Sequence, residues 1–515
     1  MKINKLSLFL LLPLLVSCGG AAATGDIETY TPNLPEFKNK NVGAIKTDGT
    51  YDYLDIYELS DFHGAVQYNA QEKQIGLARL GSYFDKKREA NPGGTVILSG
   101  GDMWQGSADS NLTRGNLVTY SMDVIGFDSM TMGNHEFDWT KKWIENNKNK
   151  ATFPILGANI YDRSTRQIAN LYSPSRVITR GDYKVGIIGT IGDNIRRSII
   201  PSAISDVDFK NEIEIVTAEA SRLKTEEKCD VILWSSHRDA VELNTLYTTD
   251  LGINGVFGGH SHTNGNLYNE AFDLAFLQSE PYAQTIPHLQ LKINKSTKEV
   301  STSVHEIDTN PTAVNYAEDK DIKSLIDQYS ENIIGTVKAK VLGSTDGTLK
   351  IQDTLANLAV YSMKEEVKRS VDFKDYNIVA SFHNRNGGVR KDIAQGDITY
   401  GQVYESFPFD NEVVIIKITG DVLKTKFLKN GMGGNYSTWH NLSNKAIDNS
   451  TEYYVITSDF MESNEAYFGG HGGEVIPTGI VIRESVSNQI SILKKIETKN
   501  FKNSVSEFNI STIQY

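Results

Sequence analysis

Cysteine is nearly absent from this 515-residue chain, which contains only Cys18 and Cys229. Cys229 lies just before the apolar run 231–234, so we expect it to be a buried, unreactive thiol. Long hydrophobic runs are scarce as well. The apolar run 6–16 is too short to span a bilayer of about 30 Å as a helix, and no other segment is long and apolar enough to do so.

Positive charge is also in deficit. The chain has 52 Lys and Arg residues against 64 Asp and Glu residues, for a formal net charge of -12. This balance argues against a nucleic-acid polymer or an anionic membrane surface as the main partner. It leaves a small anionic substrate open, because the local field of a site can oppose the global sign.

The first 18 residues have the pattern of an export signal. Lys2 and Lys5 precede the apolar run 6–16, and small residues then lead into Cys18. The Leu-x-x-Cys ending resembles a bacterial lipoprotein signal. The resemblance implies that Cys18 becomes the lipid-bearing N-terminus of an exported protein anchored at the bacterial cell surface. An ordinary secretory signal that happens to contain a cysteine is the alternative.

Lipidation of Cys18 would leave Cys229 without a partner, and no intramolecular disulfide would then be possible. The stretch 19–50 is polar and contains Gly, Ala, Thr and Pro. We therefore expect it to be a flexible tether.

The chain is too long for one ordinary hydrophobic core, so two domains are expected. Apolar content of 39% and charged content of 23% describe a soluble globular protein. From residue 51 onward an apolar run of strand length is repeatedly followed by small residues and then by a residue type that binds metal ions. The runs are 54–59, 95–98, 129–132, 231–234 and 255–257. The residues that follow them are Asp61, His63, Asp102, Asn134, His237, His260 and His262.

Segments of helical composition separate these runs, for example 76–90 and 212–227. Strands that alternate with helices predict an α/β fold, in which ligands bind beyond the carboxyl ends of the strands. Each polar residue alone is compatible with a turn or a helix cap. Because the pattern occurs five times at the same topological position, we expect the side chains to converge on one site.

The residue types indicate which ions would bind. Carboxylate and amide oxygens mixed with imidazoles suit divalent ions such as Zn²⁺, Mn²⁺ or Fe²⁺, and the lack of thiolates disfavours a structural zinc site. One aspartate can bridge two ions. Two ions about 3.5–4 Å apart can lower the pKa of a bridging water and hold both oxygens of an in-line displacement. This arrangement hydrolyses phosphate esters.

The hexapeptide 133–138 adds a candidate acid. His135 can donate a proton near neutral pH, and Asp138 lies three residues further on. On a helical turn this spacing brings the carboxylate within reach of the imidazole, where it would fix the tautomer and stabilise the charged form. Gly-Asn-His is also ordinary turn and helix-start chemistry.

Residues 51–308 resemble the metallophosphoesterase domain of the bacterial 5′-nucleotidase and UDP-sugar hydrolase family. The resemblance is carried by five motifs in this order and at these separations: Asp-x-His, Gly-Asp, Gly-Asn-His-Glu, a lone strand-end His and Gly-His-x-His. The resemblance implies a four-layer α/β/β/α domain with two divalent metal ions, such as Zn or Mn. It implies that Asp61, His63 and His262 hold one ion and that Asn134, His237 and His260 hold the other, with Asp102 bridging the two. It also implies that His135 and Asp138 are the catalytic dyad. Relatives often have Gln or Asn in place of His262, so this departure is expected to tune the metal preference.

Residues 309–335 are polar and then helical in pattern, with Ile322, Leu325, Ile326, Tyr329 and Ile333 spaced for one helix face. They predict a helix that joins the two domains. Residues 336–505 mix strands and turns, including the runs 413–418 and 453–456, and predict a smaller α+β domain.

Three motifs stand out in this second unit: 386–390, 396–399 and 408–411. The two glycines of the first allow backbone to approach a ligand closely, and Arg390 could clamp a phosphate or carboxylate. Phe409 could stack on a base. Each feature alone is more often a turn or a core aromatic residue.

Together these motifs resemble the C-terminal, substrate-binding domain of the same family. The resemblance implies that the substrate is bound by Asn386, Gly388, Arg390, Phe409 and Asn411. The family stacks the base between Phe409 and a second aromatic residue, which lies just before a Gly-Gly-Asp-Gly turn. Phe460, Tyr467 and Phe468 compete for that role, and Tyr467 or Phe468 is expected from its nearness to the turn.

Two departures from the family put the nucleoside specificity in doubt. His471 stands at the usual aspartate of the turn. Relatives often place an arginine a few residues before Asn357, where this sequence offers only Lys350, and Arg385 is expected to compensate.

The sequence thus predicts a cell-surface phosphohydrolase with two metal ions that acts on nucleoside 5′-monophosphates. Substrate access is expected to need rotation of the domains about 309–335. The open alternatives are a 2′,3′-cyclic-nucleotide phosphodiesterase, a UDP-sugar hydrolase, and a surface binding lipoprotein with an unused phosphoesterase core. We expect a nucleotide as partner, no nucleic-acid polymer, membrane attachment through Cys18, and a monomer, with a dimer left open.

Overall fold

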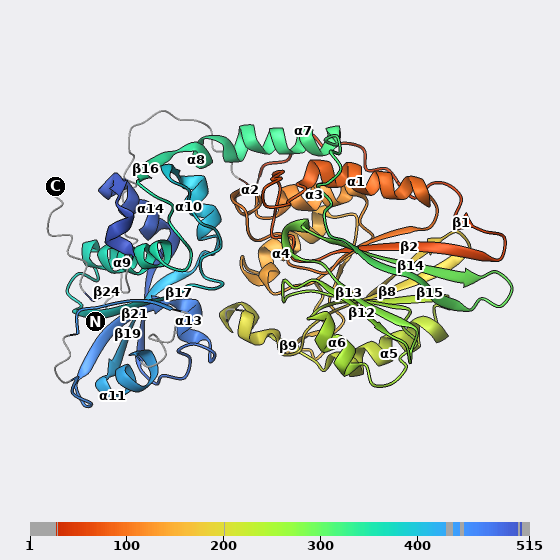
Figure 1. The fold of residues 1–515 in the computed structure, drawn as a ribbon. Coiled ribbons are helices and arrows are strands. Elements are labelled where there is room, and N and C mark those ends of the chain that lie inside the picture. Colours follow the sequence, from red (N-terminus) through yellow and green to blue (C-terminus); the bar gives the residue numbers. More distant parts are fainter. Residues whose placement is uncertain are drawn as a thin grey trace, which may run out of the picture.

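The computed structural model describes residues 27, 29–199, 201–428, 436–442, 447–502 and 505–506. The predicted signal peptide and Cys18 lie outside the described residues. Figure 1 shows two domains joined across the top by helix α7 (Lys320–Tyr329). Within the described residues, no helix combines the length and the apolar character needed to cross a membrane.

The first domain contains two facing β-sheets. The first sheet has the order β15-β14-β2-β3-β4-β5, with β1 paired to β2, and its strands β2 to β5 run parallel. Its members are β1 (Lys46–Thr47), β2 (Tyr51–Leu59), β3 (Thr95–Ser99), β4 (Ser129–Thr131), β5 (Ile155–Leu156), β14 (Ile286–Asn294) and β15 (Val300–Asp308).

The second sheet has the order β12-β13-β11-β10-β8-β7. Its four inner strands are parallel, and an antiparallel strand closes each edge. Its members are β7 (Ser175–Arg180), β8 (Tyr183–Ile191), β10 (Val231–His237), β11 (Gly255–Gly258), β12 (Gly265–Asn269) and β13 (Leu274–Gln278).

The two sheets pack face to face through a continuous apolar layer, in which Leu54 and Val96 of the first sheet meet Val185 and Leu233 of the second. Helices cover the outer faces. Those over the first sheet include α1 (Leu77–Ala90), α3 (Asn116–Ile125) and part of α7, and those over the second are α5 (Glu212–Thr225) and α6 (Ala240–Leu246). The predicted four-layer α/β/β/α arrangement is confirmed, and Cys229 is buried among the outer helices, where burial raises the pKa of its thiol.

Shorter elements complete the domain. They are α2 (Ala108–Leu112), α4 (Lys141–Lys150), the strand pair β6 (Ile160–Asp162) and β9 (Val207–Phe209), and the single turns η1 (His135–Phe137), η2 (Ile195–Ser198), η3 (Pro201–Ile204) and η4 (Pro281–Ala283).

The connecting helix starts later and ends later than its predicted range. Residues 309–319 contain no helix, and Asp319 caps α7 through its side chain. The helix continues through the π-helical turn η5 (Ser330–Ile334) into α8 (Gly335–Ala339). The predicted apolar face is buried, since Ile322, Leu325, Ile326, Tyr329 and Ile333 all pack into the core of the first domain.

The second domain is built on a sheet of order β22-β19-β21-β17-β20-β24 and a small sheet of order β18-β16-β23. The strands are β16 (Val341–Thr345), β17 (Ile378–Asn384), β18 (Gly396–Thr399), β19 (Glu412–Thr419), β20 (Tyr436–His440), β21 (Glu452–Ser458), β22 (Glu474–Val481), β23 (Lys495–Ile496) and β24 (Val505–Ser506). The helices are α9 (Thr354–Arg369), α10 (Tyr400–Ser406), α11 (Gly420–Val422), η6 (Leu423–Leu428), α13 (Asp459–Ser463), α14 (Ile482–Leu493) and η7 (Thr498–Phe501). Strands and helices mix as predicted for an α+β domain.

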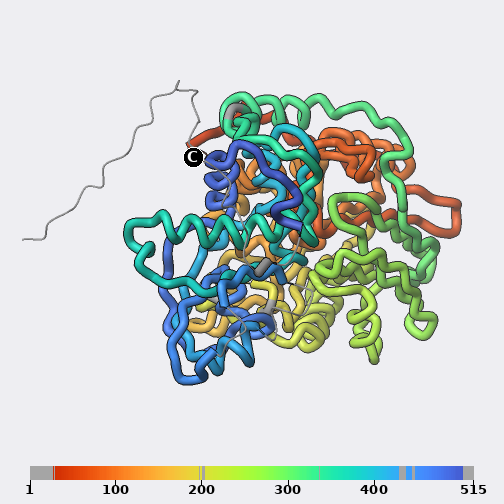
Figure 2. The backbone as a smooth tube through the Cα atoms, turned by 60° about the vertical axis from the view of Figure 1, so that its left-hand side comes forward, coloured from red at the N-terminus to blue at the C-terminus, as the bar shows by residue number. Residues whose placement is uncertain are grey.

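The described part of the predicted tether is packed against the first domain and is not free chain. Tyr30 packs its ring edge-on to Tyr329, with centroids 5.1 Å apart, and its hydroxyl donates to the carbonyl oxygen of Gln328. Lys40 Nζ pairs with Asp85 at 2.8 Å. Figure 2 shows this red segment running beside the green helix α7. The prediction of a flexible stretch was therefore wrong for residues 29–50, because its aromatic residues find apolar partners.

The packing between the sheets can be tested at Leu233, which is completely buried in the shared layer. Leu233→Ala should cost about 3 kcal/mol and lower the apparent Tm by about 6–12 °C, because it leaves a cavity between two rigid sheets. Thermal unfolding followed by circular dichroism measures this. Val371→Ala, at a side chain 79% exposed in the second domain, is the matched control and should leave the Tm unchanged. Equal Tm values for both variants would contradict the two-sheet core.

Candidate metal centre and active site

Five strands end at one place. Strands β2, β3 and β4 of the first sheet and β10 and β11 of the second are parallel within their sheets, and polar residues follow each carboxyl end. The structure brings all seven predicted metal ligands together there. They are Asp61, His63, Asp102, Asn134, His237, His260 and His262.

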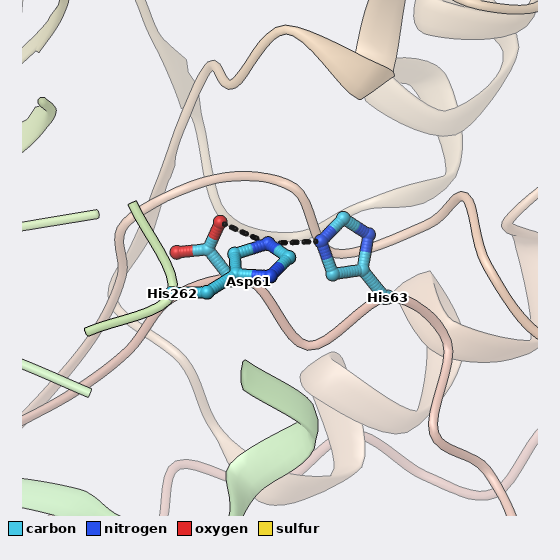
Figure 3. Close-up of side chains that lie close together, drawn as sticks. All are labelled: Asp61, His63 and His262. Carbon is cyan, nitrogen blue, oxygen red and sulfur yellow. Dashed lines mark hydrogen bonds and ion pairs between the residues drawn. The ribbon is translucent and has the colours of Figure 1, made fainter. Parts of the chain in front are cut away.

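Asp61, His63 and His262 form the first cluster, with ligand atoms that all lie within 4.8 Å of one another. Figure 3 shows the two imidazoles facing each other, with 3.0 Å between their Nε2 atoms and 3.4 Å from His262 Nε2 to Asp61 Oδ1. Asp61 Oδ1 is buried and accepts no hydrogen bond from the described residues. An orphaned carboxylate oxygen beside two converging imidazole nitrogens fits a divalent cation.

Asp102, His237 and His260 form the second cluster under the same distance limit. His237 Nε2 lies 3.2 Å from Asp102 Oδ2 and 3.1 Å from Asn134 Oδ1, so the asparagine belongs to this group. Burial, together with the charge of His237, lowers the pKa of His260 to about 4 and keeps that ring neutral.

Backbone carbonyls orient two of the histidines. His63 Nδ1 donates to the carbonyl oxygen of Gln105 at 2.9 Å, and His237 Nδ1 donates to that of Gly100 at 2.8 Å. Each bond turns the ring so that Nε2 points into its cluster. Histidines that bind metals are normally held in this way, so the donor set fits a metal centre in its supporting contacts as well.

The candidate ligands occupy a strained backbone conformation. Five of the seven have a φ angle in the left-handed region, which costs free energy for residues other than glycine. They are Asp61 (55°), His63 (48°), Asp102 (53°), His260 (73°) and His262 (58°). Such strain persists only where the surroundings impose it, and here it turns side chains from the ends of neighbouring strands toward a common point.

Glu136 ties two of these loops together, a role that sequence reasoning missed although the residue stands inside the motif. Its buried carboxylate accepts hydrogen bonds from the backbone N–H groups of Asp102, Met103 and Gly133, at 2.8–2.9 Å. Gly133 has to be glycine, because a Cβ there would lie 2.2 Å from Asp102 Oδ1.

The predicted dyad is formed on the single turn η1. His135 Nδ1 lies 2.8 Å from Asp138 Oδ2, as expected for residues three apart on a helical turn. The His135 backbone N–H also donates to Asp102 Oδ1 at 2.8 Å, which joins the dyad to the metal cluster. Burial acts to lower the pKa of His135, but the charges of Asp138 and Asp102 outweigh it and raise that pKa.

Two residues of the second domain reach the dyad. Arg390 Nη2 donates to His135 Nε2 at 3.1 Å, and its guanidinium carbon lies 5.3 Å from the ring centroid of Phe409. The rings of Phe409 and His135 have centroids 5.4 Å apart. A cavity of about 260 Å³ lies between these groups. From the second domain it is lined by Gly388, Arg390, Phe409, Asn411, Phe460 and Tyr467, among others.

Three residues predicted to bind substrate lie elsewhere. Phe468 is completely buried and stacks on Phe427 in the core of the second domain, with ring centroids 4.3 Å apart. Arg385 is not among the residues that line the cavity, and it donates to Ser437 Oγ at 3.1 Å. The exposed Asn386 accepts from Gln352 and contributes no lining. The assignment of Phe468 was wrong, because its ring is buried in the core. The assignments of Arg385 and Asn386 stay predictions, and neither residue lines this cavity.

The cavity contains other residues in their place. Phe460, which the sequence offered but did not favour, faces it together with Tyr467, and the rings lie 5.6 Å apart. Asn384 and Asp410 also line it and were not predicted to bind substrate, although Asp410 lies inside the motif 408–411 and Asn384 lies two residues before the motif 386–390. His471 lies outside the cavity lining and is paired with Glu462 at 3.0 Å.

Comparisons with known proteins agree with this geometry. Residues 54–264 match the calcineurin-like phosphoesterase family and residues 333–443 match the 5′-nucleotidase C-terminal domain, between them more than half of the chain. The chain is 26% identical to the protein UshA of Yersinia enterocolitica, over 84% of this chain and 88% of the relative. It is also 26% identical to the 5′-nucleotidase of Vibrio cholerae, over 88% of this chain and 93% of the relative.

A crystal structure of a 5′-nucleotidase precursor from Thermus thermophilus superposes with a TM-score of 0.71 at 20% identity, over 86% of this chain and 97% of that one. The 5′-nucleotidase of Candida albicans superposes with a TM-score of 0.63 at 14% identity, over 87% and 99%. These superpositions show a shared two-domain fold. The chain therefore belongs to the 5′-nucleotidase and UshA family of metal-dependent phosphoester hydrolases, in which a calcineurin-like phosphoesterase domain precedes a 5′-nucleotidase C-terminal domain.

Proposed function

We propose that this protein releases phosphate from nucleoside 5′-monophosphates. The observation that carries the proposal is one cavity in which both metal clusters and the His135–Asp138 dyad face Arg390 and the aromatic rings of the second domain. The candidate metal ligands, the dyad and Arg390 suit a phosphate, and the aromatic rings suit a base. Relatives named 5′-nucleotidase support the same assignment.

We assign the metal ligands by cluster. Asp61, His63 and His262 would hold one divalent ion, Asn134, His237 and His260 the other, with Asp102 between them. Oxygen and imidazole donors without thiolate suit Zn²⁺, Mn²⁺ or a similar ion. When bound, two such ions supply an activated water and neutralise charge on the phosphate.

His135 is assigned as the acid. Asp138 holds Nδ1, so Nε2 is the atom presented to the cavity. Arg390 donates to Nε2 in the described structure, so this nitrogen carries no proton while that contact lasts. Once substrate takes the place of Arg390, the raised pKa of His135 favours a proton on Nε2, which can be donated to the charge that develops on the phosphate and to the leaving alkoxide. Asp138 acts through His135 by fixing its orientation and stabilising its charge.

The second domain would choose the substrate. Arg390 already contacts the dyad, so its remaining N–H groups are placed to clamp phosphate oxygens. Phe409 offers one face for the base, and Tyr467 or Phe460 offers the other. Because the cavity is shared by two domains, entry of substrate would require the second domain to rotate about the connecting helix.

We further propose export and lipid attachment at Cys18. The support is the sequence pattern of residues 1–18, which lie outside the described part of the chain.

The dyad assignment predicts that His135→Ala lowers kcat by about 10²- to 10⁴-fold, because the transition state loses its proton donor while the metal ligands stay in place. Steady-state kinetics on AMP and metal analysis of the same sample measure both effects. His305→Ala, a histidine at a distance from the cavity that stacks on Tyr268, is the matched control and should behave as wild type. Near wild-type kcat for His135→Ala would refute the assignment.

The cluster assignment predicts that His262→Ala lowers the metal content from about two ions to about one per chain, because it removes a ligand of the first cluster only. Inductively coupled plasma mass spectrometry after dialysis gives the stoichiometry. An unchanged metal content would show that His262 binds no ion.

A substrate panel tests the proposed reaction. Purified protein with Mn²⁺, Zn²⁺ or Co²⁺ should give its highest kcat/KM on AMP, compared with UDP-glucose and a 2′,3′-cyclic nucleotide, because the cavity sets Arg390 and the candidate metal ligands beside the aromatic rings proposed to hold one base. Activity on none of them would favour the surface binding lipoprotein.

A second cavity favours a second candidate function. It has a volume of about 500 Å³ and is lined by His63, Gln105, Tyr282 and Arg390, of which Arg390 also lines the first cavity. Gln105 is completely buried, and neither polar atom of its side chain has a partner among the described residues. A phosphorus that carries a second polar group, as in a nucleotide sugar, would have room for that group here. A higher kcat/KM on UDP-glucose than on AMP would establish this function instead.

A further inference from the structure

Residues 407–411, which we term the base loop, present Phe409 to the cavity and are held from behind by one arginine of the second domain. Arg483 donates to the carbonyl oxygens of Phe407 and Phe409 at 3.3 and 3.2 Å, and to Asp410 Oδ1 at 2.6 Å. Its side chain is 6% exposed, and its guanidinium lies 3.8 Å from the ring centroid of Tyr404. This support is internal to the domain, so it persists wherever the domain moves.

The first domain holds the same loop from the other side. The second oxygen of Asp410, Oδ2, accepts from Arg114 Nη1 at 2.9 Å, and Asn111 Nδ2 donates to the carbonyl oxygen of Pro408 at 2.9 Å. Both donors come from α2 and the turn that follows it. In Figure 1, α2 lies at the junction beside α10, which directly precedes the base loop.

The turn around Arg114 is firmly placed. Its φ angle is 49°, in the left-handed region, and its carbonyl oxygen accepts from Asn147 Nδ2 at 2.8 Å. Its guanidinium lies 5.5 Å from the ring of Trp139. Because the backbone and the guanidinium of Arg114 are already held, the side chain loses little further conformational freedom when it binds Asp410. Arg114 can therefore set the position of the base loop relative to the first domain.

Two of the contacts that cross between the domains at the cavity differ in the groups that they use. The Arg390–His135 contact uses groups that the phosphate would bind, so substrate replaces it at least in part. In the Arg114–Asp410 pair, Arg114 occupies Asp410 Oδ2 and Arg483 occupies Oδ1, so both oxygens of this cavity-lining carboxylate already have partners. Arg114 can therefore hold the base loop against the first domain without using the groups assigned to the phosphate.

We propose that Arg114 is a positioning residue, which seats the base loop against the first domain so that a base on Phe409 and a phosphate at the metal clusters are bound together. The proposal rests on the nucleotidase function proposed above. It predicts that loss of Arg114 weakens the contribution of the base to substrate binding and leaves the rate of phosphate-ester hydrolysis unchanged.

The test compares AMP with ribose 5-phosphate, which has the same ester and no base. Arg114→Met should raise KM for AMP about fivefold, the effect of one partly exposed ion pair, with kcat for AMP and kcat/KM for ribose 5-phosphate within about twofold of wild type. Arg114→Lys, which keeps the charge but loses the planar fork, should recover part of the loss. Arg163→Met removes another Arg–Asp pair of the first domain, the pair with Asp208, and is the control. It should leave KM and kcat unchanged for both substrates.

A double-mutant cycle separates positioning from general damage to the fold. In an Asp410→Asn background the Arg114→Met substitution should add no further loss on AMP, because the pair is already broken. Equal losses on both substrates, no loss on either, or additive losses in the cycle would each overturn the proposal. If wild-type protein fails to hydrolyse AMP, the proposed function fails and this inference falls with it. If only Arg114→Met is indistinguishable from wild type, the inference alone fails.

Discussion

The chemistry of this protein depends on one geometric constraint: parallel strands of two stacked sheets end at the same edge of the first domain. Parallel order places the loops after β2, β3 and β4 side by side, and the second sheet adds the loops after β10 and β11. The apolar layer between the sheets sets how far apart these two groups of loops lie. The left-handed backbone of Asp61, His63 and Asp102 is the local cost of turning their side chains inward, and sheet packing supplies the rigidity that holds it.

The described part of the second domain lines the cavity but contributes nothing to the two candidate metal clusters. Every candidate metal ligand and both members of the dyad belong to the first domain, whereas Arg390 and the aromatic residues belong to the second. In the proposed function the first domain would carry the hydrolysis and the second would choose the substrate, so the two have to be held in a fixed relative position. His135 is the residue at which they meet, because its backbone N–H contacts Asp102 and its Nε2 contacts Arg390.

The first domain was largely predictable from the sequence, and the substrate site was not. A strand followed by a ligand is a local pattern, so β2, β3, β4, β10 and β11 could be recognised with their site residues. The role of Glu136 needed three backbone N–H groups from two loops, which only the folded chain brings together. Tyr467 and Phe468 are chemically similar neighbours, and the sequence cannot tell which one packs on Phe427 and which one faces the cavity.

The packing of the N-terminal segment along α7 has a mechanical consequence. Tyr30 fastens the incoming chain to the connecting helix at Tyr329, and Lys40 fastens it to Asp85 of α1, so both contacts are with the first domain. A pull on this segment therefore acts on the first domain, which contains both candidate metal clusters. If the second domain rotates as proposed, a protein held by this segment would not have to break these contacts.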